Sequence, residues 1–291
     1  MKKKKKITGF DVIVYIVSFI LLVVVLYPLV LVISSSVSDP MAVSAGKVVF
    51  LPKGFNLDGY KAFFGDADLM IGYANTLFYT VVGTMINLLV TVPAGYALSR
   101  DTLPGRGFFT ALFMFVMYFS GGMIPLFLVV NKLGLYNTRW TLLILGAFST
   151  YNCIICRSFF VAMPKDIIEA AEIDGCSSVK TFIQIVLPLS KALLGVMVLY
   201  FAVGHWNSYF NAMIYIRDDL KQPLQIFLRR ILIMAQMEAA GEEMLDGGDA
   251  VRRELLMRYS SIVVSSLPLM IIYPFLQKYF DKGVLIGSVK G

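Results

Sequence analysis

The stretch E-A-A-E-I-D-G, residues 169–175, is followed ten residues later by I-V-L-P at 185–188. It is charged and helix-forming, yet it lies between two long apolar runs, at about 140–160 and 193–216. Apolar runs of that length are typical of membrane-spanning helices. A polar, helix-forming loop between two such runs therefore indicates a surface that meets a soluble partner.

The composition of the whole chain agrees with a membrane protein. Hydrophobic residues make up 58% of its 291 residues and charged residues 15%, and its mean hydropathy is +0.75, well above that of a water-soluble domain. A spanning helix needs roughly 20 apolar residues, and lipid offers the backbone no hydrogen-bond partners. We therefore predict an all-α integral membrane protein. Its six spans are expected at about 12–33, 75–98, 108–130, 140–160, 193–216 and 260–280.

The distribution of charge predicts the orientation of these spans. With the N-terminus inside, the inner segments carry the whole formal net charge of +7, in agreement with the positive-inside rule. The spans then form one domain, residues 12–280, between cytoplasmic tails at 1–11 and 281–291. The polar loop, about 163–190, is cytoplasmic, and a long loop at about 217–259 lies outside.

Several classes of function are excluded by what the sequence lacks. It has one histidine and three cysteines, and it has no G-x-x-x-x-G-K-[ST] loop that could hold a nucleotide phosphate. We therefore expect no enzymatic activity, no bound cofactor, no metal site and no ATP hydrolysis by this chain. An ion-coupled carrier needs acids within its spans. The predicted spans contain none apart from Asp11 near the start of the first, so that alternative is disfavoured.

The polar loop is predicted to form two short helices. Pro164 suits the start of a helix, and Gly175 is the residue type that ends one with a positive φ, so the first helix is expected over about 165–174. Ser177 or Ser178 then caps the second helix. An apolar stripe at helical spacing follows, comprising Val179, Phe182, Ile183 and Val186.

The first of these helices offers a docking surface. Two adjacent alanines, Ala170 and Ala171, let the backbone of a partner approach closely. Glu169 and Asp174 supply carboxylates that can pair with basic groups of that partner. A solvated connector that binds nothing is the alternative interpretation of the same residues.

The spacing of the whole pattern is more specific than its parts. E-A-A, two residues, D-G, nine residues and I-x-L-P resembles the cytoplasmic loop of permease subunits in bacterial ATP-binding-cassette (ABC) importers, which have the type I importer permease fold. One position departs, because Cys176 stands where that family usually has alanine. Further stretches resemble the carbohydrate-uptake branch, and specifically the second permease of maltose-type systems. These are residues 75–76, 96–100, 157–160, 163–164, 206–207, 282–284 and 289–291.

The resemblance implies a role for the loop and a set of partners. The first short helix would be a coupling helix that inserts into a groove on an ATPase subunit, with Glu169 as its anchor. Ala170 and Ala171 would permit the fit, and Gly175 would set the turn that follows Asp174. The implied partners are a homologous second permease, two copies of the ATPase, which bind ATP and Mg, and an extracellular solute-binding protein. The assembly would lie in the lipid bilayer of a bacterial plasma membrane, and no nucleic acid is implied.

The implied cargo is a sugar or oligosaccharide, carried along a path that this chain half encloses. Polar and aromatic residues of the fifth span can hydrogen-bond hydroxyls and stack on a sugar ring, but helix-to-helix contacts would explain them equally. They are His205, Trp206, Asn207, Tyr209 and Asn211, with Asn152 and Asn87 as further candidates. Arg229 and Arg230 suggest an acidic oligosaccharide, such as a pectin or alginate fragment, or else a solvated basic pair. The sequence does not specify the solute, and a non-sugar solute is the alternative.

Overall fold

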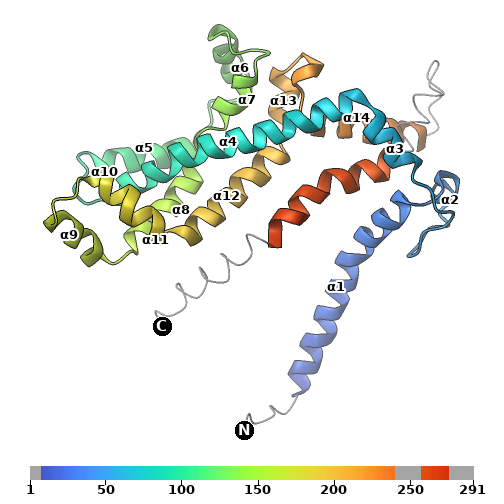
Figure 1. Ribbon diagram of the computed structural model, residues 1–291, viewed down its shortest axis with the longest axis horizontal. Coiled ribbons are helices and arrows are strands. Elements are labelled where there is room, and N and C mark those ends of the chain that lie inside the picture. The colour runs from blue at the N-terminus through green and yellow to red at the C-terminus, as the bar shows by residue number, and fades with distance from the viewer. Residues whose placement is uncertain (1–7, 240–256, 275–291) are drawn as a thin grey trace. The chain divides into compact units, whose positions relative to one another are not determined.

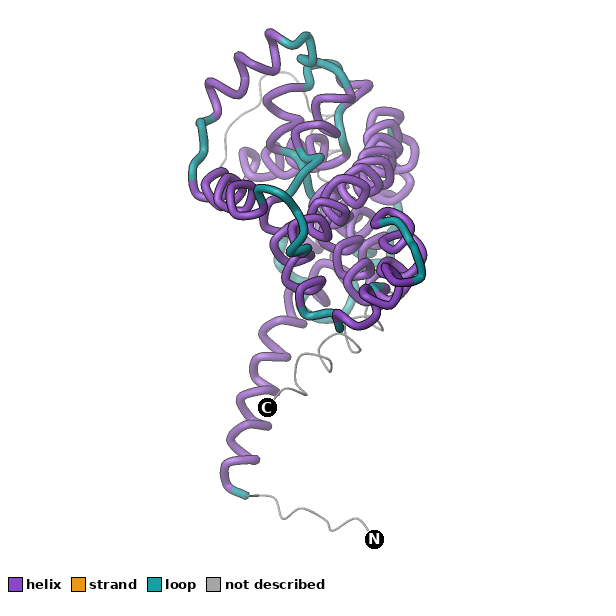
Figure 2. Tube along the Cα trace, turned by 90° about the vertical axis from the view of Figure 1, so that its left-hand side faces the viewer, coloured by secondary structure: helices purple, strands orange, loops and turns teal. Residues whose placement is uncertain are grey.

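The computed structural model describes residues 8–239 and 257–274 (Figure 1). Helices make up the regular structure of those residues, and Figure 2 shows no strand among them. The described chain forms two compact units. One consists of residues 68–227 with 268–274, and the other of residues 8–67 with the described part of 228–267. The prediction of an all-α protein is therefore confirmed.

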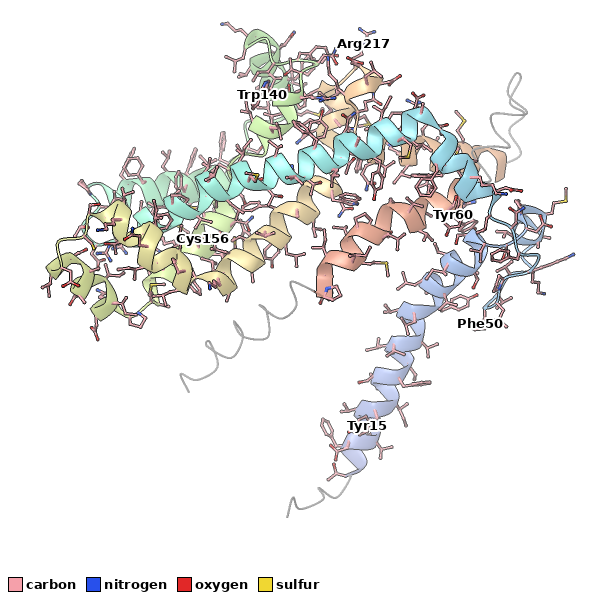
Figure 3. All side chains as sticks on the ribbon, viewed as in Figure 1. Tyr15, Phe50, Tyr60, Trp140, Cys156 and Arg217 are labelled. Atoms are coloured by element: carbon pink, nitrogen blue, oxygen red, sulfur yellow. The ribbon has the colours of Figure 1, made fainter. Side chains whose placement is uncertain are left out.

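The unit that contains the beginning of the chain starts with a long apolar helix. α1 (Gly9–Ser36) has 28 residues and is long and apolar enough to cross a membrane. Thr8 caps it, because its hydroxyl accepts a hydrogen bond from the Asp11 N–H while the Asp11 carboxylate accepts one from the Thr8 N–H. Figure 3 shows side chains such as Tyr15 projecting from this helix, and none before Ser34 is buried. The short helices α2 (Pro40–Ser44) and α3 (Asp58–Gly65) follow.

The other unit is built along α4 (Ala67–Ser99), a continuous helix of 33 residues that passes through Pro93. The helices that follow it in the chain are α5 (Arg106–Tyr118), α6 (Met123–Lys132), α7 (Arg139–Leu145), α8 (Thr150–Val161), α9 (Lys165–Ile173) and α10 (Ser178–Thr181). The π-turn η1 (Phe182–Val186), α11 (Leu187–Leu189), α12 (Lys191–Trp206), α13 (Phe210–Tyr215) and the 3₁₀ turn η2 (Asp219–Lys221) come next, and α14 (Leu224–Ala239) begins in this unit.

Three of the predicted spans are not single helices. The third is divided into α5 and α6, which are bent by 112° at a glycine-containing break where Gly122 adopts φ +87°. The fourth is divided into α7 and α8, which are bent by 45° after Gly146. The fifth stops at Trp206 and resumes as α13. At the first of these breaks Gly122 adopts a conformation open to it because it lacks a Cβ, and apolar composition alone reveals none of the three.

The described residues contain between two and five candidate spans. α1 and α4 each qualify alone, and three bent helix pairs each add one if the pair is a single broken span. One of these pairs joins residues 178–189 to α12 with a bend of 84°. The sixth predicted span is helical over 257–274. Its remaining residues, the predicted C-terminal tail, residues 1–7 of the predicted N-terminal tail and most of the loop after 239 lie outside the described residues.

The core of the α4 unit lies where α4, α8, η1 and α12 meet. Close packing of α4 on α8 depends on Gly95, because a Cβ there would lie 2.5 Å from the Cβ of Cys156 and 3.0 Å from the carbonyl oxygen of Cys153. Small residues permit such close contacts between membrane helices. The buried side chains of this core are Val92, Tyr96, Cys156, Phe160, Val186, Leu193, Met197 and Phe201.

Candidate functional site

The first helix of the polar loop forms where the sequence predicts it. α9 runs over Lys165–Ile173 and is followed by Gly175 at φ +75°. The N–H of Gly175 donates to the carbonyl of Glu172 at 3.1 Å, and the N–H of Cys176 donates to the carbonyl of Ala171 at 3.0 Å. These two bonds form a Schellman motif, which requires a left-handed residue at the glycine position. The predicted turn at Gly175 is confirmed.

The second helix of the loop is also present, but it is not a regular α-helix. Ser177 caps α10 by accepting a hydrogen bond from the N–H of Lys180 at 3.4 Å. The chain then passes into η1, where the N–H of Leu187 donates to the carbonyl of Phe182. This five-residue hydrogen-bond spacing is that of a π-helix, which adds one residue to the turn.

Two residues of the predicted apolar stripe face the inside of this chain and two face outward. Val186 is fully buried and Phe182 is half-buried, but Val179 is 67% exposed and Ile183 is 56% exposed. Thr181 is buried as well, and it lies five residues before Val186. The inward face of this segment therefore follows the π spacing rather than the 3.6-residue period on which the stripe was predicted.

The docking residues predicted on α9 do not all face outward. Glu169 and Ala170 are exposed, and Ile173, one turn further on, is 85% exposed. Ala171 is only 4% exposed and packs inside the chain, so one alanine rather than two can admit the backbone of a partner. Asp174 is exposed after the last turn. We call Glu169, Ala170 and Ile173 the α9 face.

An ion pair joins α9 to the end of α4. Nη2 of Arg100 donates to Oε1 of Glu172 at 2.7 Å. A second link follows at Asp101, whose carboxylate accepts from Nζ of Lys165 at 3.1 Å and also from Arg106. These two cations hold the pKa of the Asp101 carboxyl below its ordinary value. Sequence reasoning missed both links, although it placed the charges involved in segments on the same side of the membrane.

Tyr96, one turn before Arg100 on α4, contacts the other half of the polar loop. Its ring stacks on that of Phe182 in η1 with a centroid distance of 4.8 Å, and it meets the Phe160 ring edge-on at 5.5 Å. The Arg100 guanidinium lies 5.9 Å from the centre of the Tyr96 ring, within the range of a cation–π interaction. The end of α4 thus contacts α9 through Arg100 and η1 through Tyr96.

Among the predicted solute-path residues, His205 lies within helix packing. Its Nε2 is 2.6 Å from Oδ1 of Asn87 on α4, and the amide of Asn87 donates to the carbonyl of Gly146 at the break between α7 and α8. Gly83 makes room for the imidazole, because a Cβ there would lie 2.5 Å from the ring. This arrangement matches the helix-to-helix interpretation of His205 and Asn87.

The structure separates the remaining candidates. Trp206 is 3% exposed, and its ring meets that of Tyr73 edge-on at 5.8 Å. Asn152 is buried too, near the start of α8, where its N–H donates to the hydroxyl of Ser149. The others, Asn207, Tyr209 and Asn211, are exposed. Solute binding by any of them stays a prediction. Within residues 8–239 and 257–274, no three acidic, histidine or cysteine side chains gather where they could hold a metal ion.

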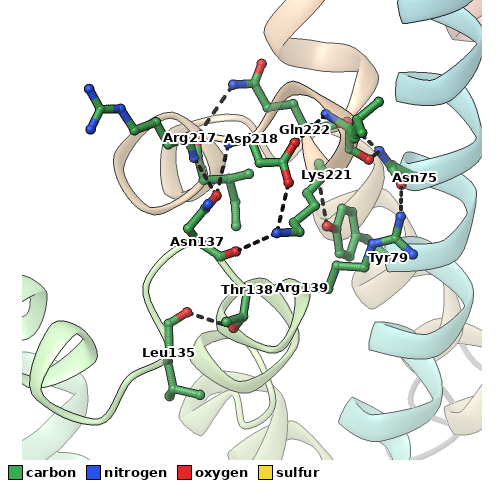
Figure 4. A network of polar contacts seen from close by, with 12 residues as sticks. Asn75, Tyr79, Leu135, Asn137, Thr138, Arg139, Arg217, Asp218, Lys221 and Gln222 are labelled. Carbon is green, nitrogen blue, oxygen red and sulfur yellow. Dashed lines mark hydrogen bonds and ion pairs between the residues drawn. The ribbon is translucent and has the colours of Figure 1, made fainter.

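A second polar network lies towards the other end of α4 (Figure 4). The amide of Asn75 donates to the carbonyls of Leu220 at 2.8 Å and Gln222 at 3.1 Å. Its oxygen accepts from Nη2 of Arg139 at 3.0 Å. The hydroxyl of Tyr79 donates to the carbonyl of Lys221 at 2.8 Å. Two successive turns of α4 therefore hold the segment 220–222.

Asn137 completes this network from the loop before α7. It adopts a left-handed φ of +59°, and its side-chain oxygen accepts from the N–H groups of Arg217 at 3.0 Å and Asp218 at 2.9 Å. Nζ of Lys221 donates back to the carbonyl of Asn137 at 3.1 Å. Sequence reasoning missed these contacts. We call Asn75, Tyr79, Asn137 and Arg139, together with the segment 217–222, the clasp.

Comparison with known proteins gives one consistent result. Residues 69–286 match the family described as the inner membrane component of binding-protein-dependent transport systems. Protein LplC of Bacillus subtilis is 39% identical over 268 residues, which are 92% of this chain and 90% of that protein. The polygalacturonan/rhamnogalacturonan transport system permease protein YtcP of the same organism is 37% identical over 283 residues, which are 97% and 98% of the two chains.

A solved structure gives the same fold. The crystal structure of a bacterial ABC transporter involved in the import of the acidic polysaccharide alginate contains a chain that is 33% identical, with a TM-score of 0.83. The match covers 95% of this chain and 100% of that one. The family match over residues 69–286 includes the polar loop, the clasp and all but the first two residues of α4. The chain belongs to the family of inner membrane components of binding-protein-dependent transport systems, and it is a permease subunit of an ABC importer rather than an enzyme.

Proposed function

We propose that α9 is the coupling helix of this permease and that it docks on a separate ATPase subunit in the cytoplasm. The α9 face supports this proposal, since it combines the exposed carboxylate of Glu169, the small side chain of Ala170 and the largely exposed Ile173. A helix that enters a groove needs an apolar anchor and a face that fits closely. The carboxylate of Glu169 beside these two residues would favour a groove whose rim carries basic side chains.

The two glutamates of α9 have different roles in this proposal. Glu172 pairs with Arg100 of its own chain, whereas Glu169 is exposed on the α9 face. In the assembled importer, we expect Glu169→Lys to lower the amount of ATPase that copurifies with the permease, while Glu172→Gln leaves it unchanged. Equal loss of the ATPase in both variants would show that the α9 face is not the specific docking surface.

A permease with this coupling role belongs to an assembly of five protein chains and the lipid bilayer. This permease pairs with a homologous second permease, two ATPase copies bind ATP and Mg, and an extracellular solute-binding protein delivers the solute. The loop at 163–190 and both tails face the cytoplasm, and the clasp faces outside. The support for this orientation is the distribution of the net charge of +7 along the sequence.

We further propose that the solute is an acidic oligosaccharide derived from a uronate polymer. One observation carries this proposal: two proteins similar to this chain over nearly its whole length are named for the transport of polygalacturonan or rhamnogalacturonan and of alginate. All of these polymers carry carboxylates on their sugar rings. A neutral oligosaccharide and a non-sugar solute are the alternatives.

The clasp contains a cation that suits such a solute. Arg139 is exposed, donates to the neutral amide oxygen of Asn75 and lies 5.5 Å from the centre of the Phe78 ring. Both of these contacts are neutral, and the Asp218 carboxylate of the clasp lies within electrostatic range of the guanidinium without forming an ion pair with it. Guanidinium groups bind carboxylates in a bidentate geometry, so Arg139 can meet a uronate at the outer end of the path.

The test begins with the solute-binding protein that copurifies with the complex. We expect calorimetry to detect binding of trigalacturonate and a large loss of affinity for its methyl ester, which keeps the rings and removes the charges. Uptake of trigalacturonate into proteoliposomes should then fall in Arg139→Gln and be retained in Arg139→Lys. Equal binding of the methyl ester, or a preference for maltotriose, would overturn the acidic assignment.

A further inference from the structure

α4 contacts both halves of the polar loop although neither end of the loop is joined to it. The chain enters the loop from α8 and leaves it through α12. Arg100, directly after α4, nevertheless pairs with Glu172 of α9 at 2.7 Å. Tyr96, one turn earlier, stacks on Phe182 of η1 at 4.8 Å. A displacement of either half of the loop therefore acts on the same end of α4.

The clasp holds α4 at a distant point. Asn75 and Tyr79 grip the segment 220–222 through three hydrogen bonds to its carbonyls. Between Asn75 and Arg100 the helix rises by about 37 Å at 1.5 Å per residue. Figure 1 shows α9 at one end of α4, with α4 unbroken along its length. A continuous helix held at both ends can pass a displacement from one end to the other.

Packing at the middle and in the last turn of α4 restricts how the helix can move. The backbone at Gly95 lies so close to α8 that an added Cβ would come within 3.0 Å of the Cys153 carbonyl oxygen. Further along, Gly83 is covered by the ring of His205. α4 therefore cannot slide along its axis independently of α8 and α12, and it must tilt or move together with them.

We propose that α4 is a connecting rod between the coupling helix and the clasp, with Arg100 and Glu172 as the positioning pair that joins it to α9. Movement of α9 by the ATPase is passed to α4 through Arg100, and movement of η1 is passed to α4 through Tyr96. From α4 it reaches the segment 220–222 through Asn75 and Tyr79. Coupling free energies are reciprocal, so an event at the clasp also biases α9. This inference rests on the proposed docking of the ATPase at α9.

The exposure of the pair makes the proposal testable without unfolding the protein. The side chains of Arg100 and Glu172 are 24% and 49% exposed. Partly exposed ion pairs contribute little to stability. Reversing one charge should therefore leave the fold and the docked ATPase in place while weakening the connection between α9 and α4.

The experiment reports on the clasp end of α4. Leu220, which is 59% exposed, is replaced by cysteine and labelled with an environment-sensitive fluorophore in a Cys176→Ser background. Cys153 and Cys156 are both fully buried and should not react. In proteoliposomes that contain the complete importer, we expect MgATP to change the emission of this label. No solute is required, so the result is independent of the proposed cargo.

The variants distinguish a connecting role of the Arg100–Glu172 pair from a merely structural role. We expect Arg100→Glu to reduce the ATP-dependent change roughly fivefold, and the swap Arg100→Glu with Glu172→Arg to restore it. Lys61→Glu breaks an exposed ion pair with Asp58 on α3 and should have no effect. A full response in Arg100→Glu, or no recovery in the swap, would overturn the proposal.

Copurification of the ATPase distinguishes the two proposals. Arg100→Glu should retain the ATPase, and its loss would assign Arg100 to docking and overturn the connecting role. If Glu169→Lys instead keeps both the ATPase and the response at position 220, the docking proposal fails. If the ATP-dependent emission change at position 220 then still depends on Arg100, the connecting role of α4 is supported while the docking of the ATPase at α9 is not.

Discussion

Nε2 of His205 lies 2.6 Å from Oδ1 of Asn87, and this hydrogen bond joins α12 to α4. Asn87 also donates through its amide to the carbonyl of Gly146, which ends α7. Since the amide oxygen of Asn87 can only accept, Nε2 of His205 carries the hydrogen. One asparagine thus satisfies a carbonyl freed by a helix break and orients the histidine of this chain.

We predict that Asn87→Leu destabilises the protein by about 1 to 2 kcal/mol, because it removes both bonds and leaves the Gly146 carbonyl without its donor. Thermal unfolding of the purified complex in detergent measures the effect. Asn211→Leu is the matched control, since Asn211 is exposed on α13 and its replacement should change stability by less than about 0.5 kcal/mol. Equal stability of the two variants would contradict the structural role of Asn87.

Gly95→Ala should destabilise the protein by about 1 to 3 kcal/mol, because the new methyl group would overlap the Cβ of Cys156 and press on the Cys153 carbonyl. Gly107→Ala serves as the control, since no atom lies within 4 Å of a Cβ at that position. Alanine has the higher helix propensity, so the control should be neutral or slightly stabilising. Thermal unfolding again compares the two, and an unaffected Gly95→Ala would show that α4 and α8 are not tightly packed.

Gly175→Ala should uncouple ATP hydrolysis from uptake. The glycine has φ +75° and no neighbour within 4 Å of a Cβ, so the substitution adds backbone strain of about 1 to 2 kcal/mol without a steric clash. The strain acts on the turn that sets α9, and we expect uptake per ATP hydrolysed to fall in proteoliposomes. Gly175→Asn should be milder, because asparagine tolerates the left-handed region. Gly204→Ala, also in open space but at an ordinary φ, should transport normally.

The ion pairs of Asp101 predict a pH dependence of stability. Hydrogen bonds from Lys165 and Arg106 lower the pKa of this carboxyl from its ordinary value of 3.8. A carboxyl whose pKa is lowered by folding stabilises the folded state above its ordinary pKa, and the contribution is lost as pH falls through the lowered value. Asp101→Asn should therefore unfold at a lower temperature than the parent near pH 6, and the difference should vanish as the pH falls well below 3.8.

The control for this prediction is Asp174→Asn, which removes a carboxylate that forms no ion pair within the described residues. Its unfolding temperature should stay close to that of the parent across the same pH range. A difference between the parent and Asp101→Asn that does not change with pH would show that the carboxylate contributes by packing rather than by charge.

Local features of the fold could be predicted from the sequence. α9 and its turn follow from a proline, a run of helix formers and Gly175, all within a dozen residues, and the structure places the helix at Lys165–Ile173. The ion pair of Arg100 with Glu172 joins residues 72 apart, and Asn75 bonds to Leu220 across 145. Such contacts depend on how the helices pack, and no local pattern specifies them.

The breaks within the spans were beyond prediction for a related reason. A window of 20 apolar residues records how much of a segment suits lipid, not whether its helix is straight. Ser120, Gly121 and Gly122 lie inside such a window and still divide it, with a bend of 112°. The carbonyl freed by the later break at Gly146 needs Asn87 from another helix, and that requirement appears only in three dimensions.

The π-turn at Phe182–Val186 also holds one residue more than a regular α-helical turn of the polar loop would. Each residue of an α-helix advances the chain by about 100° around its axis. Removing one residue from this turn and restoring regular α-helix would therefore leave α10 and the loop leading back to Gly175 at nearly the same angle relative to α12. A second deletion would rotate them by about 100°, so a functional homologue can lack one of these five residues but not two.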